Sequence, residues 1–170
     1  VPPSSGLAVD ANGVIDLQIL EGALANEAAT RPLVAVQHVN NETGVIQPIE
    51  EIAAIVRAAN GLYFCDCSQS AGKIALPDAD LIAISAHKLG GPPGVGALLV
   101  KNFASIAPSG GQEQGYRGGT ENLPAILGFA AALSGREDWI DRATALRASL
   151  ESKLEANGAQ VVAGGTPRLA

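Results

Sequence analysis

Residues 81–94 have the sequence LIAISAHKLGGPPG, in which an apolar run ends in polar and basic residues. The run is as long as a buried β-strand and places Ser85, His87 and Lys88 at its end. A glycine- and proline-rich bend follows, and residues 96–100 (GALLV) then predict another strand. The stretch therefore predicts two strands of a sheet, with a polar cluster where the first one ends.

Lys88 lies beside glycines and not on the polar face of a helix, a position suited to work on a ligand. In a dry pocket the ammonium form of lysine is disfavoured, and the free amine attacks carbonyl groups. Taken alone, however, this segment is better explained by a solvated lysine in a surface turn. The neighbouring strands change that interpretation.

Residues 62–67 (LYFCDC) form a predicted strand that carries Asp66 near its end and is followed by Gln69. Its connection to the next strand is long enough for the crossover that joins parallel strands. Because ligands bind outside the carboxyl ends of such strands, Asp66 and Lys88 should face one crevice. A lysine for an aldehyde, an aspartate for a pyridinium nitrogen and small polar donors for a phosphate predict a pyridoxal phosphate (PLP) site.

Four short motifs occur in order along the chain. They are HVNNETG (38–44), DCSQS (66–70), SAHK (85–88) and GGTENLP (118–124). Together they resemble the cysteine desulfurases, members of the class V aminotransferase family with the PLP fold-type I architecture. The resemblance runs through nearly the whole chain and implies an α/β fold: part of a large PLP-binding domain with a mostly parallel sheet flanked by helices.

The resemblance implies a set of cofactor-binding residues and no metal site. The cofactor-binding residues would be Asn41, Asp66, Gln69, Ser85, His87, Lys88 and Thr120. Lys88 would bind PLP covalently and later move protons on the substrate, and Asp66 would stay ionised and keep the pyridine nitrogen protonated. With His87, these two residues form the predicted catalytic group.

The remaining cofactor contacts follow from the same resemblance. Asn41 and Gln69 would hydrogen-bond the ring oxygen of PLP, while Ser85 and His87 hold its phosphate. Thr120 would contact the phosphate of the cofactor in the other subunit, which implies a homodimer. Apart from the resemblance, asparagines and glycines in these segments also fit ordinary turn chemistry.

The composition excludes several classes of protein. The 170 residues make about one domain, and 47% of them are hydrophobic, enough for a core. The net charge of −6 argues against nucleic-acid binding, and no apolar run reaches the ~18 residues of a membrane span. Two cysteines one residue apart provide no disulfide framework, and the first residues lack the pattern of a signal sequence. We therefore expect a cytoplasmic protein.

Hydrophobic periodicity and capping residues predict the other elements. The predicted helices are 17–24, 49–59, 125–133 and 139–157, and the predicted strands are 33–39 and 160–163. Asp16 and Pro48 should begin the first two helices. The run 33–39 is too continuous for a sheet with one wet face, so we expect it to be buried on both sides. The long helix carries a stripe made of Ile140, Ala143, Leu146, Leu150 and Leu154.

His38, Cys65 and Cys67 are predicted to be core residues. His38 lies inside an apolar strand, where we expect it to have a partner. Strand alternation puts both cysteines on the face opposite Asp66. Two thiols are too few for a structural zinc site, and a central strand lacks the exposed, electropositive setting of a catalytic thiol.

Relative to the family, the chain resembles a middle piece of a longer enzyme, lacking an N-terminal segment and most of the C-terminal domain. We expect residues 1–138 to belong to the PLP-binding large domain. Residues 139–170 would form the linking helix and the start of the small domain. The cysteine that accepts sulfur would lie outside this chain, so the isolated piece should be inactive.

The function implied is conversion of L-cysteine to L-alanine, with sulfur passed to acceptor proteins of iron–sulfur or thio-cofactor assembly. Another class V enzyme such as a selenocysteine lyase would share the same PLP residues. A non-catalytic module that keeps only the fold is a second alternative, although the retained Lys88, Asp66 and His87 argue against it. A nucleotide-binding α/β domain is disfavoured because no P-loop or dinucleotide fingerprint is present.

Overall fold

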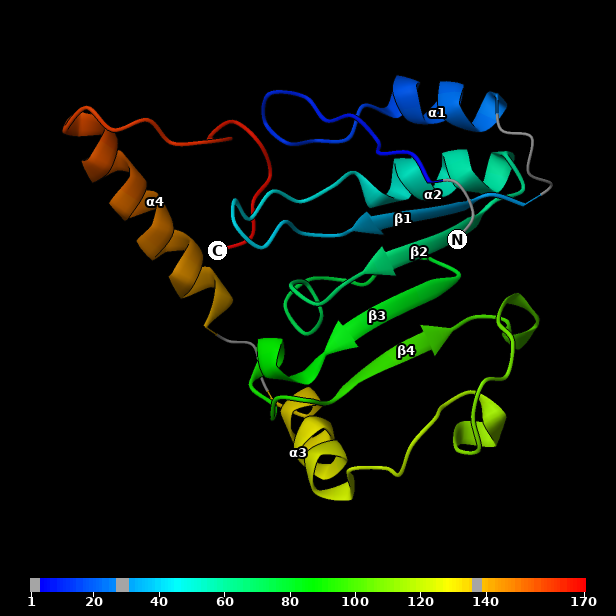
Figure 1. Ribbon diagram of the computed structural model, residues 1–170. Coiled ribbons are helices and arrows are strands. Elements are labelled where there is room, and N and C mark those ends of the chain that lie inside the picture. Colours follow the sequence, from blue (N-terminus) through cyan, green and yellow to red (C-terminus); the bar gives the residue numbers. More distant parts are fainter. Residues whose placement is uncertain (1–3, 27–30, 136–138) are drawn as a thin grey trace.

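The computed structural model describes residues 4–26, 31–135 and 139–170, and its centre is a four-stranded sheet in the order β1-β2-β3-β4 (Figure 1). The strands are β1 Leu33–Gln37, β2 Leu62–Asp66, β3 Leu81–Ser85 and β4 Gly96–Val100. The first three run parallel, and β4 is antiparallel to β3. The predicted α/β fold with a mostly parallel sheet is therefore confirmed.

Helices of two kinds accompany the sheet. The α-helices are α1 Leu17–Ala25, α2 Ile49–Ala58, α3 Leu123–Leu133 and α4 Ile140–Ala156, and the short 3₁₀ helices are η1 Ala86–Leu89, η2 Phe103–Ser105 and η3 Glu113–Gly115. The predicted start signals are confirmed. The Asp16 carboxylate accepts hydrogen bonds from the amides of Gln18 and Ile19, at 2.9 and 3.1 Å, and Pro48 directly precedes α2.

One face of the sheet carries the core, together with α1 and α2. The crossover helix α2 links β1 to β2 and buries Ile52, Ala53 and Val56. The same apolar cluster includes Leu20 of α1 and the strand residues Val34, Val36, Tyr63, Cys65 and Ile82. Full burial of an aliphatic side chain contributes about 1.5–3 kcal/mol, so the apolar stripe of α2 is its main attachment to the sheet.

The opposite face of β1 is open in the part of the chain that the structure describes. Val34 and Val36 are buried, whereas Leu33, Ala35 and Gln37 are exposed, and Leu33 keeps 59% of its surface. The prediction that this strand is buried on both sides is thus wrong for the described chain. An apolar sequence can suit two buried faces, but a second covering layer must come from elsewhere, and the described residues do not supply it.

The last elements differ from expectation in two ways. The helix α4 forms as predicted, but Leu146, Leu150 and Leu154 of its apolar stripe are exposed. The predicted strand 160–163 is wrong: Ala163 has a φ of +54°, and the amide of Thr166 donates to its carbonyl at 3.0 Å. This left-handed turn cannot continue an extended strand. None of the described helices combines the length and apolar character needed to cross a bilayer.

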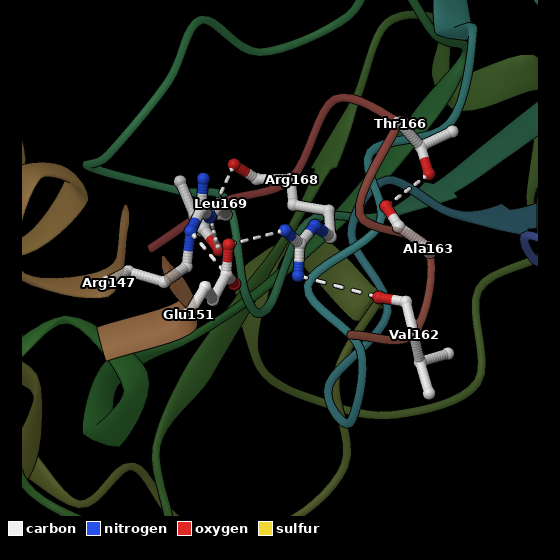
Figure 2. A network of polar contacts seen from close by, with 7 residues as sticks. All are labelled: Arg147, Glu151, Val162, Ala163, Thr166, Arg168 and Leu169. Carbon is white, nitrogen blue, oxygen red and sulfur yellow. Dashed lines mark hydrogen bonds and ion pairs between the residues drawn. The ribbon is translucent and has the colours of Figure 1, made fainter. Parts of the chain in front are cut away.

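Residues 162–169 are held by the two arginines shown in Figure 2. Arg147 Nη1 donates to the carbonyls of Arg168 and Leu169, both at 2.8 Å. Arg168 in turn pairs with Glu151 at 2.9 Å, and only 9% of its side chain is exposed. Charge-assisted bonds of this kind are stronger than neutral ones, so the segment and α4 form one unit.

This unit contacts the loop that follows β1. The amide of Leu169 donates to the carbonyl of Gly44 at 2.8 Å, and the amide of Ile46 donates to Pro167 at 2.9 Å. In Figure 1 the C-terminal segment (red) accordingly runs beside this loop (cyan). The predicted domain boundary at residue 138 lies outside the described residues and stays a prediction.

Candidate active site

A pocket of about 180 Å³ opens at the carboxyl ends of β1 and β2. Its lining residues are Gln37, Val39, Asn41, Asp66, Ser68, Gln69 and Lys88. The prediction that Asp66 and Lys88 face one crevice is therefore confirmed. In a parallel sheet this edge collects the loops that leave the strands, which is why polar residues distant in sequence meet here.

Asp66 is the last residue of β2 and pairs in register with Gln37 of β1 and Ala83 of β3. Its Oδ1 atom accepts a hydrogen bond from the amide of Ser68 at 2.9 Å, whereas Oδ2 accepts none from the described residues. One oxygen thus fixes the carboxylate, and the other is left for a ligand at the pocket.

Lys88 lies in η1, the single 3₁₀ turn that follows β3, and its side chain is exposed. Gly90 ends this turn with a φ of +88°, a backbone conformation that a side chain would disfavour. Lys73 Nζ donates to the carbonyl of Lys88 at 2.8 Å and to that of Gln69 at 2.9 Å. The backbone carrying the pocket lysine is thereby tied to the backbone that follows β2.

Asn41 reaches the pocket from the loop after β1. Asn40 shapes this loop, because its Oδ1 atom accepts from the amides of Glu42 and Thr43 at 2.9 and 3.0 Å. The side-chain amide of Asn41 donates to Glu42 at 2.7 Å. Gly44 completes the turn with a φ of +73°, and a Cβ there would lie 2.8 Å from the carbonyl oxygen of Leu169.

The structure does not bring every predicted residue to this pocket. Ser85 Oγ and His87 Nδ1 lie 2.9 Å apart beside Lys88, but neither residue lines it. Thr120 is exposed on the segment before α3 and is also absent from the lining. Their predicted phosphate contacts, including that of Thr120 to the other subunit, stay predictions.

Four residues of the site were not anticipated. Gln37, Val39 and Ser68 line the pocket, and Lys73 ties its walls together. Gln37 could have been found, because a polar residue ending an apolar strand is the same signal that identified Asp66. No local signal identifies Lys73, whose role depends on a contact with a residue 15 positions away.

Behind Asp66, on the core face, the thiols of Cys65 and Cys67 are fully buried, as predicted. Their sulfur atoms lie 3.7 Å apart, and Cys67 Sγ lies 4.0 Å from Nδ1 of the buried His38. The hydrogen bond between the two thiols, followed by burial, raises the pKa of Cys65, and the same hydrogen bond lowers the pKa of Cys67. His38 thus has a partner in the core, as expected.

A smaller hollow of about 120 Å³ lies at the other end of the sheet. It includes Asp78, which pairs with Lys101 at 2.6 Å and with Arg57 at 3.0 Å. The hydrogen bond from Lys101 lowers the pKa of Asp78. None of the predicted cofactor residues lines this hollow. Across the described residues, no group of three His, Cys, Asp or Glu side chains is placed to bind a metal ion.

A mostly parallel sheet with an aspartate ending one strand and a lysine following the next is the arrangement that the sequence predicted for a PLP site in an α/β protein. Residues 5–163 match the family described as Aminotransferase class-V, and the chain therefore belongs to the class V aminotransferases. The family depends on PLP. The pocket fits this cofactor, because it offers an amine, a carboxylate with an available oxygen, and three side-chain amides.

Similar proteins include cysteine desulfurases. "Cysteine desulfurase IscS" of Anaeromyxobacter sp. (strain Fw109-5) is 42% identical over 164 residues, which cover 88% of this chain and 40% of the relative. The mitochondrial cysteine desulfurase of Drosophila melanogaster is 42% identical over 151 residues, covering 79% of this chain and 32% of the relative. The chain thus spans well under half the length of these relatives.

Solved structures of similar proteins have the same fold as this chain. A NifS-like protein from Rickettsia africae ESF-5 has a TM-score of 0.84 at 33% identity, covering 96% of this chain and 49% of the other. A structure described as SspA in complex with cysteine has a TM-score of 0.68 at 30% identity, covering 81% of this chain and 43% of the other. These similarities confirm the predicted family and fold architecture.

Proposed function

We propose that this chain is the central part of a PLP-dependent cysteine desulfurase. The observation that carries the proposal is the pocket in which Lys88, Asp66, Gln69 and Asn41 meet. The relatives named cysteine desulfurase support the reaction, and the similar SspA structure, described in complex with cysteine, supports the substrate class. The proposed reaction converts L-cysteine to L-alanine and passes the sulfur to an enzyme cysteine.

When bound, PLP supplies an electron sink for bond breaking at the amino acid. Lys88 would hold the aldehyde end and move protons on the substrate, since it follows β3 and lines the pocket. Asp66 would keep the pyridine nitrogen protonated through its available oxygen. Asn41 and Gln69 would donate hydrogen bonds to the ring oxygen, and the Ser85–His87 pair would bind phosphate.

The sulfur acceptor in this proposal lies outside these 170 residues. Both cysteines of the chain are completely buried in the core, on the face of β2 opposite Asp66. An acceptor thiolate must reach the substrate sulfur, form a sulfur–sulfur bond with it and leave the electrons of the broken carbon–sulfur bond on the carbon side. Buried Cys65 and Cys67 cannot make that approach.

We further propose a cytoplasmic homodimer that delivers sulfur to acceptor proteins of iron–sulfur or thio-cofactor assembly. The exposed position of Thr120, away from the pocket of its own chain, supports a role at the cofactor of a second subunit. Two reduced, buried cysteines suit a reducing compartment. Names such as IscS among the relatives support the assembly role.

The decisive experiment locates the lysine that binds PLP. In the complete protein loaded with PLP, borohydride should fix a pyridoxyl group on Lys88, identified by peptide mass spectrometry. Lys88→Ala should abolish this covalent link and the formation of alanine from L-cysteine, whereas Lys101→Ala should retain both. An adduct on Lys73 or Lys101 in the wild-type protein would end the assignment.

A further inference from the structure

We infer that Lys73 is a positioning residue that holds the two walls of the active site at a set distance, an inference that rests on the proposed function. Its ammonium donates to the carbonyl of Gln69 at 2.9 Å and to the carbonyl of Lys88 at 2.8 Å. Gln69 and Lys88 both line the pocket and come from different strand ends. A single side chain thus bridges the segments after β2 and β3.

The two hydrogen bonds from Lys73 lie beyond the region where pairing of β2 with β3 fixes the distance between the two segments. The last residue pair between β2 and β3 is Asp66 with Ala83, extended by a hydrogen bond from the amide of Cys67 to Ala83. Beyond this point the two chains separate into a turn and into η1. Gln69 and Lys88 lie beyond the backbone hydrogen bonds that join β2 to β3. The two bonds from Lys73 therefore connect their backbones instead.

The geometry of Lys73 itself is well defined by local structure. The amides of Ala71, Lys73 and Ile74 donate to carbonyls within the same tight turn, at 2.8, 2.9 and 3.1 Å. The lysine stem is half-buried, which limits its freedom. Bonds from an ammonium to carbonyls are charge-assisted and stronger than neutral ones. The rigid turn and these two bonds together hold the backbone of Gln69 at a fixed distance from that of Lys88.

The spacing matters because covalent capture of an aldehyde depends on where the amine sits. Asp66 and Gln69 would orient the cofactor ring from β2, while Lys88 must meet its aldehyde from β3. A shift of about 1 Å between such groups can cost a large factor in reactivity. Without Lys73, η1 would lose this side-chain hydrogen bond to the segment after β2, and Lys88 would meet the aldehyde less often.

The test compares Lys73→Met with Lys101→Met in the complete protein. Lys101→Met removes a lysine whose ammonium also makes a short polar contact, an ion pair with Asp78 at 2.6 Å, but at the opposite end of the sheet. For Lys73→Met we expect the dissociation constant for PLP, titrated by absorbance into the apoprotein, to rise about tenfold. Coupling to Lys88 by borohydride should fall in parallel. Lys101→Met should change neither by more than about twofold.

Two further measurements separate positioning from general stability. In the apoprotein, amide hydrogen exchange of residues 86–90 should be faster in Lys73→Met but unchanged in Lys101→Met. Lys73→Arg, which keeps the charge and the donors, should restore part of the PLP affinity. If Lys73→Met is too unstable to purify, Lys73→Gln, which can still donate to one carbonyl, takes its place.

Either of two results would overturn the inference. One is equal PLP affinity for Lys73→Met and Lys101→Met; the other is unchanged exchange of residues 86–90. The exchange experiment needs no cofactor, so it tests the tie even if the proposed function fails. Failure of the proposed function would instead appear as absence of coupling to Lys88 in the wild-type protein.

Discussion

At the scale of single residues, the side chains of Cys65, Asp66 and Cys67 at the end of β2 alternate between the core and the pocket. Asp66 points to the pocket side, while Cys65 and Cys67 point into the core with their thiols in contact. A carboxylate thus stands at the pocket with a densely packed layer directly behind it. The side chain is further fixed by the amide of Ser68, so its position depends little on the ligand.

Asp66→Asn tests the charge of this residue while keeping its shape. We expect alanine formation to fall far more than PLP affinity, because the amide cannot hold a proton on the pyridine nitrogen. The lost charge-assisted bond is worth about 1.5–3 kcal/mol in binding, and the weaker electron sink adds to the loss of rate. Steady-state kinetics and absorbance titration measure the two effects. Equal activity of variant and wild type would make Asp66 a purely structural carboxylate.

Gly44→Ala tests the close approach between the loop after β1 and the C-terminal segment. Gly13→Ala is the matched control, because Gly13 has a similar φ of +82° but open space around it, whereas Gly44 faces the carbonyl of Leu169. Left-handed strain costs each variant about 1–2 kcal/mol, and the clash should add to the loss only in Gly44→Ala. Urea unfolding measures the difference, and equal destabilisation by both substitutions would contradict it.

At the scale of elements, the helix α4 is connected to the pocket by contacts of the segment 162–169 that follows it. Arg147 and Glu151 hold the segment 162–169, and that segment pairs with the loop after β1 on both sides of Val45, a fully buried residue. The same loop carries Asn41 to the pocket. The loop that carries a predicted cofactor contact is therefore connected, through backbone hydrogen bonds, to the ion pair between Arg168 and Glu151 of α4.

Arg168→Met should loosen this connection. The substitution removes the ion pair with Glu151, whose loss is worth about 1–3 kcal/mol because Arg168 is largely buried. Hydrogen exchange of the Ile46 and Leu169 amides should become faster, while exchange in α2 stays unchanged. Lys153→Met, on an exposed part of the same helix, is the control. Exchange at Ile46 that is equally slow in both variants would show that the ion pair does not hold the loop.

At the scale of the whole molecule, the described chain leaves apolar surface uncovered. Leu33 of β1, Leu98 of β4, Leu127 of α3 and Leu146 of α4 each expose more than half of their surface, at 59, 51, 61 and 61%. Exposed apolar side chains gathered on several elements are a liability for an isolated domain. The similar solved chain from Rickettsia africae is about twice as long, since this chain covers 49% of it.

The 170-residue chain purified alone should therefore be inactive and prone to self-association. We expect no sulfide or alanine from L-cysteine after addition of PLP, and strong binding of a dye that reports exposed apolar surface. Light scattering, dye fluorescence and an alanine assay test this, with the complete protein as the positive control. Turnover that disappears on mutation of Cys65 or Cys67 would overturn the assignment of both thiols to the core.

Most elements were predictable because their signals are local. Asp16 and Pro48 mark helix starts, hydrophobic periodicity marks α2, and apolar runs mark the strands. The meeting of Asp66 and Lys88 followed from a general property of parallel sheets, whose carboxyl ends share one edge. These predictions required no knowledge of which distant segments touch.

Other features depended on contacts that no local pattern specifies. Residues 160–163 have the composition of a strand, yet Ala163 adopts a left-handed backbone conformation. The segment that contains it is hydrogen-bonded to Arg147 of α4. Whether the second face of β1 is covered depends on another layer of structure. The role of Lys73, which follows β2, depends on its hydrogen bond to the carbonyl of Lys88, which follows β3. Periodicity and capping act over a few residues, whereas burial and partner choice arise from packing of segments far apart in the chain.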